Sequence, residues 1–232
     1  MGKGFKRLYM INTCNKVSKL AMDYYRQLNK SFFPEEKANV VYGMRDSAYA
    51  AILDIVTPKP MDIVLDIGCG ESAFVLMLAK YAKKVYGIDD ASFANYSDWF
   101  NDISKKQEIQ SGRVEILEQS AKTIPLPDES IDVVYTISAL EHFDGDGDIL
   151  AVSEVNRILK KGGYFVGTVD YNPATEKPLG NDDPCKVYTY ESFMDRVVQY
   201  SGCRLVGDVD LPSAEDFKTI LAGLFFCLYK GE

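Results

Sequence analysis

Short apolar runs alternate with longer stretches of helical periodicity over most of the chain. Glycine, proline and acidic residues bound the runs, as is typical of buried strands, while the longer stretches repeat apolar residues every three or four positions. Because strands that alternate with helices form a parallel sheet covered on both faces, this pattern predicts an α/β fold. We expect strands near 62–66, 84–88, 113–117, 132–137, 163–169, 204–210 and 222–229, and helices near 72–82, 92–105, 148–159 and 190–201.

The first sixty residues follow a helical pattern only. Apolar residues recur at helical spacing between Val17 and Leu28, and a second apolar face runs from Ala48 to Val56. Pro58 and Pro60 end this stretch before the first strand. We therefore expect residues 1–60 to form an N-terminal helical cap within the same domain as a core over residues 61–232.

Length and composition are those of a single globular domain. The chain has 232 residues, of which 47% are hydrophobic and 26% charged, and these fractions are ordinary for a soluble protein. Its apolar runs are shorter than the roughly 18 residues that span a membrane, and the basic N-terminus lacks the apolar core of a secretion signal. We expect a cytoplasmic protein without a membrane partner.

Charge and cysteine content argue against nucleic-acid binding, a disulfide framework and a zinc site. The net charge of −8 disfavours nucleic acid as a partner, because such binding depends on Lys and Arg at phosphates. The five cysteines are widely spaced and form no C-x-x-C motif, which argues against a disulfide framework or a zinc site. We expect reduced thiols and no metal.

A glycine turn follows the first predicted strand, where Val64–Gly70 reads V-L-D-I-G-C-G, and the second strand ends on Asp89. The carboxyl ends of neighbouring parallel strands form a crevice where nucleosides bind. We expect the backbone of Gly68, Cys69 and Gly70 to approach a cofactor, since glycine has no Cβ in the way, and Asp89 to accept hydrogen bonds from the ribose. An alternative role for Asp89 is to cap a helix beginning near Ser92.

Two cofactor classes fit this layout. Residues 68–73 read G-C-G-E-S-A, which matches the G-x-G-x-x-A fingerprint of dinucleotide-binding proteins. S-adenosylmethionine (SAM) also binds beside a glycine turn, with an acid after the second strand. Asp66 favours SAM, because its negative charge beside the turn would repel a pyrophosphate and attract a sulfonium and an α-amino group.

Further motifs follow in order along the chain: Ile124–Val134 reads I-P-L-P-D-E-S-I-D-V-V, Ala139–His142 reads A-L-E-H, and Arg157–Gly163 reads R-I-L-K-K-G-G. With the glycine turn, they resemble the class I SAM-dependent methyltransferases of the small-molecule type, clearly over residues 60–170 and more loosely beyond. The resemblance implies a Rossmann-like, seven-stranded, mostly parallel sheet with helices on both faces, whose last strand is antiparallel. It also implies SAM as cofactor and S-adenosylhomocysteine as product.

The resemblance assigns site residues as well, with three departures. Ser72 stands where the family commonly has a third glycine, Asp90 where an apolar residue packs on adenine, and Ser120 where an acid reaches the adenine amino group. Asp90 has an alternative role as a helix cap. The residues expected at the cofactor are Asp66, Gly68, Cys69, Gly70, Asp89, Asp90, Ser120, Ala121, Thr136 and, from the helical cap, Arg45.

His142 is the one histidine of the chain and follows the fourth strand. An imidazole there can take a proton from a hydroxyl or amine nucleophile, or it can only support the loop. The acidic run Asp144–Asp148 lacks the glycine and glutamate that an EF-hand requires, so we expect a turn that caps a helix starting near Ile149.

These observations predict methyl transfer from SAM to an oxygen or nitrogen atom of a small molecule, such as a sugar or a natural-product intermediate. One alternative is a SAM-binding regulatory or partner subunit without methyltransferase activity, which the three departures keep open. A second is an NAD-dependent oxidoreductase. The sequence predicts neither the oligomeric state nor the acceptor.

Overall fold

The computed structural model describes residues 19–32, 45–70, 72–92, 96–173, 185–207 and 222–231. The strands are β1 (Ile63–Ile67), β2 (Lys84–Asp89), β3 (Val114–Glu118), β4 (Ile131–Ile137), β5 (Leu159–Tyr171), β6 (Arg204–Leu205) and β7 (Ala222–Tyr229). The helices are α1 (Lys19–Phe32), α3 (Arg45–Ile55), α4 (Phe74–Leu78), α5 (Tyr96–Ile103), α6 (Gln107–Gln110), α7 (Gly147–Ile158), α8 (Tyr190–Phe193) and α9 (Gln199–Ser201). A 3₁₀ turn, η1 (Leu140–His142), follows β4, and a π-helical turn, η2 (Met194–Val198), joins α8 to α9.

The strands form one seven-stranded sheet in the order β3-β2-β1-β4-β5-β7-β6. Strands β1 to β5 pair in parallel, whereas β7 lies antiparallel between β5 and β6. The strand order reverses between β1 and β4, and a crevice opens at such a point beyond the carboxyl ends of the strands. The predicted fold class, with its mostly parallel sheet, is confirmed.

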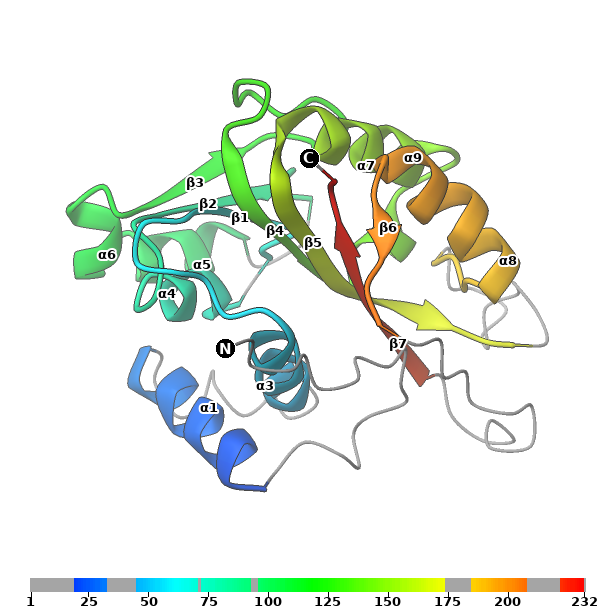
Figure 1. The fold of residues 1–232 in the computed structure, drawn as a ribbon. Helices are drawn as coiled ribbons and strands as arrows, with labels where there is room; N and C mark the ends of the chain where they lie inside the picture. Colours follow the sequence, from blue (N-terminus) through cyan, green and yellow to red (C-terminus); the bar gives the residue numbers. More distant parts are fainter. Residues whose placement is uncertain are drawn as a thin grey trace, which may run out of the picture.

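Helices cover both faces of the sheet, with α1, α3, α4 and α5 on one side and α7 to α9 on the other (Figure 1). The first face buries residues such as Ile52, Phe74 and Trp99 against Val64 and Tyr135. On the second face, Val155 of α7 and Phe193 of α8 pack with strand residues that include Leu65, Val134 and Phe226. The described helices of the first sixty residues thus pack in the same core as the sheet.

The predicted elements are present with shifted bounds. Helix α4 is shorter than the predicted 72–82, and α5 is described from Tyr96, since residues 93–95 lie outside the described residues. Strand β5 begins at Leu159 rather than 163, because Leu159 pairs with Ile131 of β4 across an irregularity in the register. Within this irregular part Gly162 takes a φ of 78° and its amide donates to Lys230 O at 2.8 Å. Much of the predicted strand 204–210 lies outside the described residues.

Candidate functional site

The glycine turn after β1 lies at the point where the strand order reverses. Gly68 and Gly70 have φ values of 67° and 45°, a region that residues with a side chain rarely adopt. The amides of Gly68 and Cys69 donate to the Ile88 carbonyl at 2.9 and 3.2 Å, so the turn is tied to the end of β2. The turn therefore lies at the carboxyl edge of the sheet, and its predicted backbone contact with the cofactor stays a prediction.

Asp89 ends β2 and faces the turn. Its Oδ2 accepts the Gly70 amide at 3.0 Å and its Oδ1 accepts the Ala91 amide at 3.0 Å. Burial raises the pKa of this carboxyl, and the two amide hydrogen bonds oppose that rise. Each carboxylate oxygen keeps a second lone pair, so Asp89 can accept two ribose hydroxyls while it holds the loop. Its alternative role as a cap of a helix near Ser92 stays a prediction, because residues 93–95 lie outside the described residues.

We expect Asp89→Asn to weaken SAM binding at least tenfold, about 1.4 kcal/mol, because the amide group offers only one acceptor oxygen for two backbone amides and two hydroxyls. Isothermal titration measures this loss. Asp62→Asn is the matched control, since Asp62 directly precedes β1, at the other end of the strand, and its Oδ2 accepts the Lys59 amide at 2.8 Å. Asp90 is exposed, its Oδ1 accepts the Ser92 amide at 3.1 Å, and its contact with the cofactor stays a prediction. Equal affinity in Asp89→Asn and the wild type would remove Asp89 from the site.

Asp66 and Cys69 lie close together below the turn. Asp66 is 2% exposed and pairs in register with Tyr135 of β4. Burial, followed by the negative charges of Asp66 and Asp89, raises the pKa of the Cys69 thiol well above its usual range. A buried, protonated thiol fits the prediction that Cys69 offers its backbone rather than its sulfur. Two acids beside a glycine turn suit the hydroxyls of a ribose and a cationic group, both of which SAM carries.

Thr136 is buried on β4 between Ile67 and Gly167 of the neighbouring strands. Its hydroxyl has no hydrogen-bond partner among the described residues. A buried polar atom without a partner is uncommon in native proteins and is a group that a ligand can satisfy. The predicted contact between Thr136 and the cofactor stays a prediction.

The loop after β3 carries Ser120 and the buried Ala121. The Ser120 hydroxyl accepts the Lys122 amide at 3.3 Å, which closes a local turn. Arg157 of α7 fixes the loop further along, where its Nη2 and Nη1 donate to the carbonyls of Ile124 and Leu126 at 2.8 Å each. The loop is therefore held in place without the acid that the family carries at the position of Ser120.

The departure at Ser72 has a structural explanation. Its Oγ accepts the Phe74 amide at 3.1 Å at the start of α4. Its carbonyl accepts the indole N–H of Trp99 at 3.2 Å, so α5 is fastened to the glycine turn. Next to Trp99, Tyr96 lies near the acids that end β2 and β3: burial and then the charge of Glu118 raise its pKa to about 12. The sequence predicted only that Trp99 and Tyr96 lie in a helix near 92–105.

Two other predictions reach beyond the described side chains. Arg45 begins α3, but its side chain lies outside the described residues, so its contact with the cofactor stays a prediction. The sequence also places a polar segment, residues 170–186, after the fifth strand, and most of it lies outside the described residues.

The rim loop, residues 138–146, connects β4 to α7 and carries His142 on an exposed turn. The 185–189 segment lies against it. The Lys186 amide donates to the Glu141 carbonyl at 2.8 Å, its ammonium donates to the Phe143 carbonyl, and Cys185 Sγ lies 2.8 Å from His142 Nδ1. His142 is therefore placed at the predicted edge of the sheet, with Cys185 as a neighbour that the sequence did not predict.

The acidic run after the rim loop differs from the prediction. Asp146 precedes α7 but makes no side-chain cap hydrogen bond. Asp148 is fully buried: it accepts from Arg196 Nη2 at 2.7 Å and from the Tyr188 hydroxyl at 2.7 Å, and Lys186 Nζ lies 3.7 Å away. Burial alone would raise the pKa of Asp148, but the hydrogen bonds from Arg196 and Tyr188 lower it below the usual carboxyl range.

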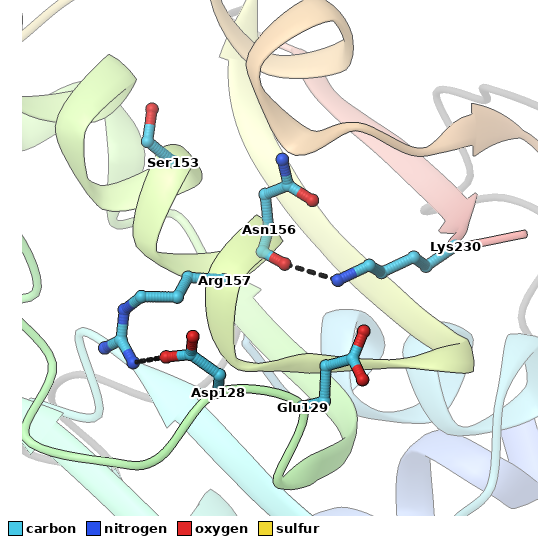
Figure 2. A pocket seen from close by; sticks show the side chains of 6 residues that line it. All are labelled: Asp128, Glu129, Ser153, Asn156, Arg157 and Lys230. Carbon is cyan, nitrogen blue, oxygen red and sulfur yellow. Dashed lines mark hydrogen bonds and ion pairs between the residues drawn. The ribbon is translucent and has the colours of Figure 1, made fainter.

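A polar hollow of about 410 Å³ lies at the opposite edge of the sheet (Figure 2). It is formed where the end of α7 meets the loop before β4 and the end of β7. Its cations are engaged within the chain: Lys230 Nζ donates to the carbonyls of Asn156 and Leu159 at 2.6 and 2.8 Å, and Arg157 pairs with Asp128 at 2.7 Å. The hollow is remote from the glycine turn and is not the cofactor site. Its lining residues are Asp128, Glu129, Ser153, Asn156, Arg157 and Lys230.

The described ranges of the chain contain neither a cluster of metal ligands nor a membrane-spanning helix. Within them, no three His, Cys, Asp or Glu side chains gather as metal ligands would. No helix in these ranges has both the length and the apolar character needed to cross a bilayer.

Comparison with known proteins agrees with the geometry. Residues 65–167 match the family model described as a methyltransferase domain. A probable S-adenosylmethionine-dependent methyltransferase of Mycolicibacterium smegmatis is 30% identical over 122 residues, which cover 50% of this chain and 42% of that protein. The chain thus spans less than half the length of this relative.

Solved structures share the fold. The [4+2]-cyclase SpnF has a TM-score of 0.66 at 14% identity, over 92% of this chain and 96% of that one. The 1,6-didemethyltoxoflavin-N1-methyltransferase of Burkholderia thailandensis, solved with S-adenosylhomocysteine, has a TM-score of 0.63 at 13% identity, over 92% of this chain and 90% of that one. The family match over residues 65–167, together with the sheet order, shows that this part of the chain is a SAM-dependent methyltransferase domain.

Proposed function

We propose that the protein transfers a methyl group from SAM to an oxygen or nitrogen atom of a small molecule. The observation that carries the proposal is the acid-and-glycine arrangement at the carboxyl edge of the sheet, where Asp89 Oδ2 holds the Gly70 amide at 3.0 Å beside the buried Asp66. SAM supplies a methyl group already activated on a sulfonium, so the protein needs mainly to align the acceptor with it.

Each part of the site has a task in this reaction. Asp89 binds the ribose, and the backbone of the turn at Gly68 and Gly70 contacts the cofactor. Asp66 offsets the positive charge of the ligand. Alignment of this kind contributes roughly 7–11 kcal/mol to lowering a barrier in favourable cases. A base is needed only where the acceptor must lose a proton, and His142 on the rim loop is the candidate.

A small-molecule acceptor is supported by charge and by one relative in fold. The chain is acidic overall, with a net charge of −8, which disfavours an RNA substrate. The Burkholderia thailandensis enzyme that shares this fold methylates N1 of 1,6-didemethyltoxoflavin. We extend this to the present chain as a class of acceptor: a small molecule with a nucleophilic ring nitrogen or hydroxyl, such as a sugar or natural-product intermediate.

If His142 is the base, His142→Ala lowers turnover at least 100-fold, because general-base catalysis contributes about 10²–10⁴, while the affinity for SAM is unchanged. Turnover is followed with labelled SAM, and affinity by titration of the same preparation. Wild-type turnover in the variant would make His142 a structural residue of the rim loop.

A SAM-binding protein without methyl transfer is the second candidate. It is favoured by SpnF, a cyclase with the same fold, and by the replacement of the family's acid at Ser120. An acceptor screen with methyl-labelled SAM separates the two: the proposal requires label in a small-molecule product, whereas tight SAM binding with no labelled product from any acceptor class would favour the second candidate.

A further inference from the structure

We propose that Cys185 and His142 form a thiol–imidazole pair that makes Cys185 a nucleophile toward soft carbon electrophiles at the rim of the site. The inference goes beyond methyl transfer and does not depend on it. A nucleophile within hydrogen-bond reach of a base is the structural signature of an activated thiol, and Sγ lies 2.8 Å from Nδ1.

The pair is held by elements that are distant in sequence. His142 ends the turn η1 after β4, and Cys185 begins the 185–189 segment, which a bridge between Tyr171 and Tyr188 attaches to β5. The Lys186 amide bonds to the Glu141 carbonyl at 2.8 Å, so the residues next to each member of the pair are also joined. Two fixed backbones therefore hold the sulfur beside the ring nitrogen.

The charged groups around the pair have opposing effects on the formation of a Cys185 thiolate. Lys186, adjacent to Cys185, favours a thiolate, whereas the buried Glu141, adjacent to His142, opposes it. Asp148 lies 3.7 Å from Lys186 Nζ and offsets part of that positive charge. The imidazole lies in hydrogen-bond contact with the sulfur, and a protonated imidazole stabilises a thiolate strongly.

The reaction is a displacement. The thiol proton moves to His142 Nδ1, and the sulfur lone pair forms a bond to the electrophilic carbon. With iodoacetamide as the probe, the carbon–iodine bond breaks and iodide leaves with the electron pair. The imidazolium then returns its proton to solvent, so no oxidant or reductant is needed.

The chain offers an internal control. Cys203 is half-buried like Cys185, but its Sγ faces the Ser201 carbonyl at 3.2 Å rather than a base, and burial raises its pKa. Cys69 and Cys227 are buried, and burial raises the pKa of both thiols. An activated thiol should therefore stand out in a peptide map of the folded protein.

The experiment treats the folded protein with limiting iodoacetamide at pH 6.5 and measures alkylation of each cysteine by peptide mass. Rates are divided by those in denaturant to remove local sequence effects. We expect Cys185 to react at least tenfold faster than Cys203, and His142→Gln to remove that advantage. Equal rates for the two cysteines in the wild type, or an unchanged Cys185 rate in a folded His142→Gln variant, would overturn the proposal.

Two features keep this test decisive. The comparison between Cys185 and Cys203 uses the wild-type protein, so a variant that fails to fold does not remove the readout. Alkylation is measured without SAM or acceptor, so a failure of the proposed methyl transfer leaves the result intact, and a failure of the thiol proposal leaves methyl transfer intact.

Discussion

Replacing Asp148 with alanine is expected to lower the free energy of unfolding by about 3 kcal/mol, because removing one partner of a buried ion pair leaves the other charge uncompensated. Asp148 is fully buried and accepts hydrogen bonds from Arg196 and Tyr188. The variant therefore removes this acceptor from both the guanidinium and the phenol hydroxyl. The value is at the lower end for buried pairs, since Arg196 is 26% exposed and also bonds to the Gly145 carbonyl. Urea unfolding measures the loss.

Asp146→Ala is the matched control. Asp146 accepts from the same Arg196 at 3.1 Å, but its side chain is 77% exposed, and exposed ion pairs contribute little. An equal loss in both variants would show that the burial of Asp148 does not matter.

The same pair has a defined pH dependence. Because the folded pKa of Asp148 lies below its usual range, its stabilising contribution is present above the ordinary carboxyl pKa and is lost as pH falls through the folded value. The difference in stability between the wild type and Asp148→Ala should therefore shrink in acid. A difference that is constant from neutral to strongly acidic pH would show that the contribution is not ionic.

Gly68→Ala is expected to have the second large effect, a loss of about 3 kcal/mol in folding free energy together with weaker SAM binding. The φ of 67° alone costs roughly 1–2 kcal/mol for a residue with a side chain. A Cβ at Gly68 would also lie 2.3 Å from the Ala139 Cβ, so the turn or the rim loop must move. Thermal unfolding and titration with SAM measure both effects.

Gly112→Ala separates the two contributions. Gly112 has a φ of 73°, but a Cβ there would meet nothing within 4 Å. Its loss should therefore be the conformational part alone, about 1 kcal/mol, without any effect on SAM. A Gly68→Ala variant as mild as Gly112→Ala would show that the turn is not as closely packed as the structure has it.

Much of the fold could be predicted because local pattern and topology agree. The apolar runs before Gly68 and Asp89 are buried strands of a parallel sheet, and such strands bring their carboxyl ends to one edge. The positive φ values at Gly68 and Gly70 follow from the same logic, since glycine adopts them without strain. The order of Asp66, the two glycines and Asp89 along the sequence therefore predicted where the candidate site lies.

The features that were missed depend on contacts between distant residues. Asp148 was predicted as part of a turn that caps a helix. No residue near it in sequence indicates that the side chain of Arg196, 48 positions later, packs against it and donates to its carboxylate. Cys185 lies 43 positions from His142 and carries no motif that would connect them. Strand β5 extends to Leu159 because Leu159 pairs with Ile131, 28 positions earlier, across a register irregularity that the local pattern does not indicate.

The measurement that tests the central claim most directly is isothermal titration of the purified protein with SAM, S-adenosylhomocysteine and NADH. The account predicts micromolar binding of SAM and S-adenosylhomocysteine and no binding of NADH, because the negative charge of Asp66 beside the glycine turn would repel a pyrophosphate. Binding of NADH without SAM would contradict it and would make the acid-and-glycine edge a dinucleotide site.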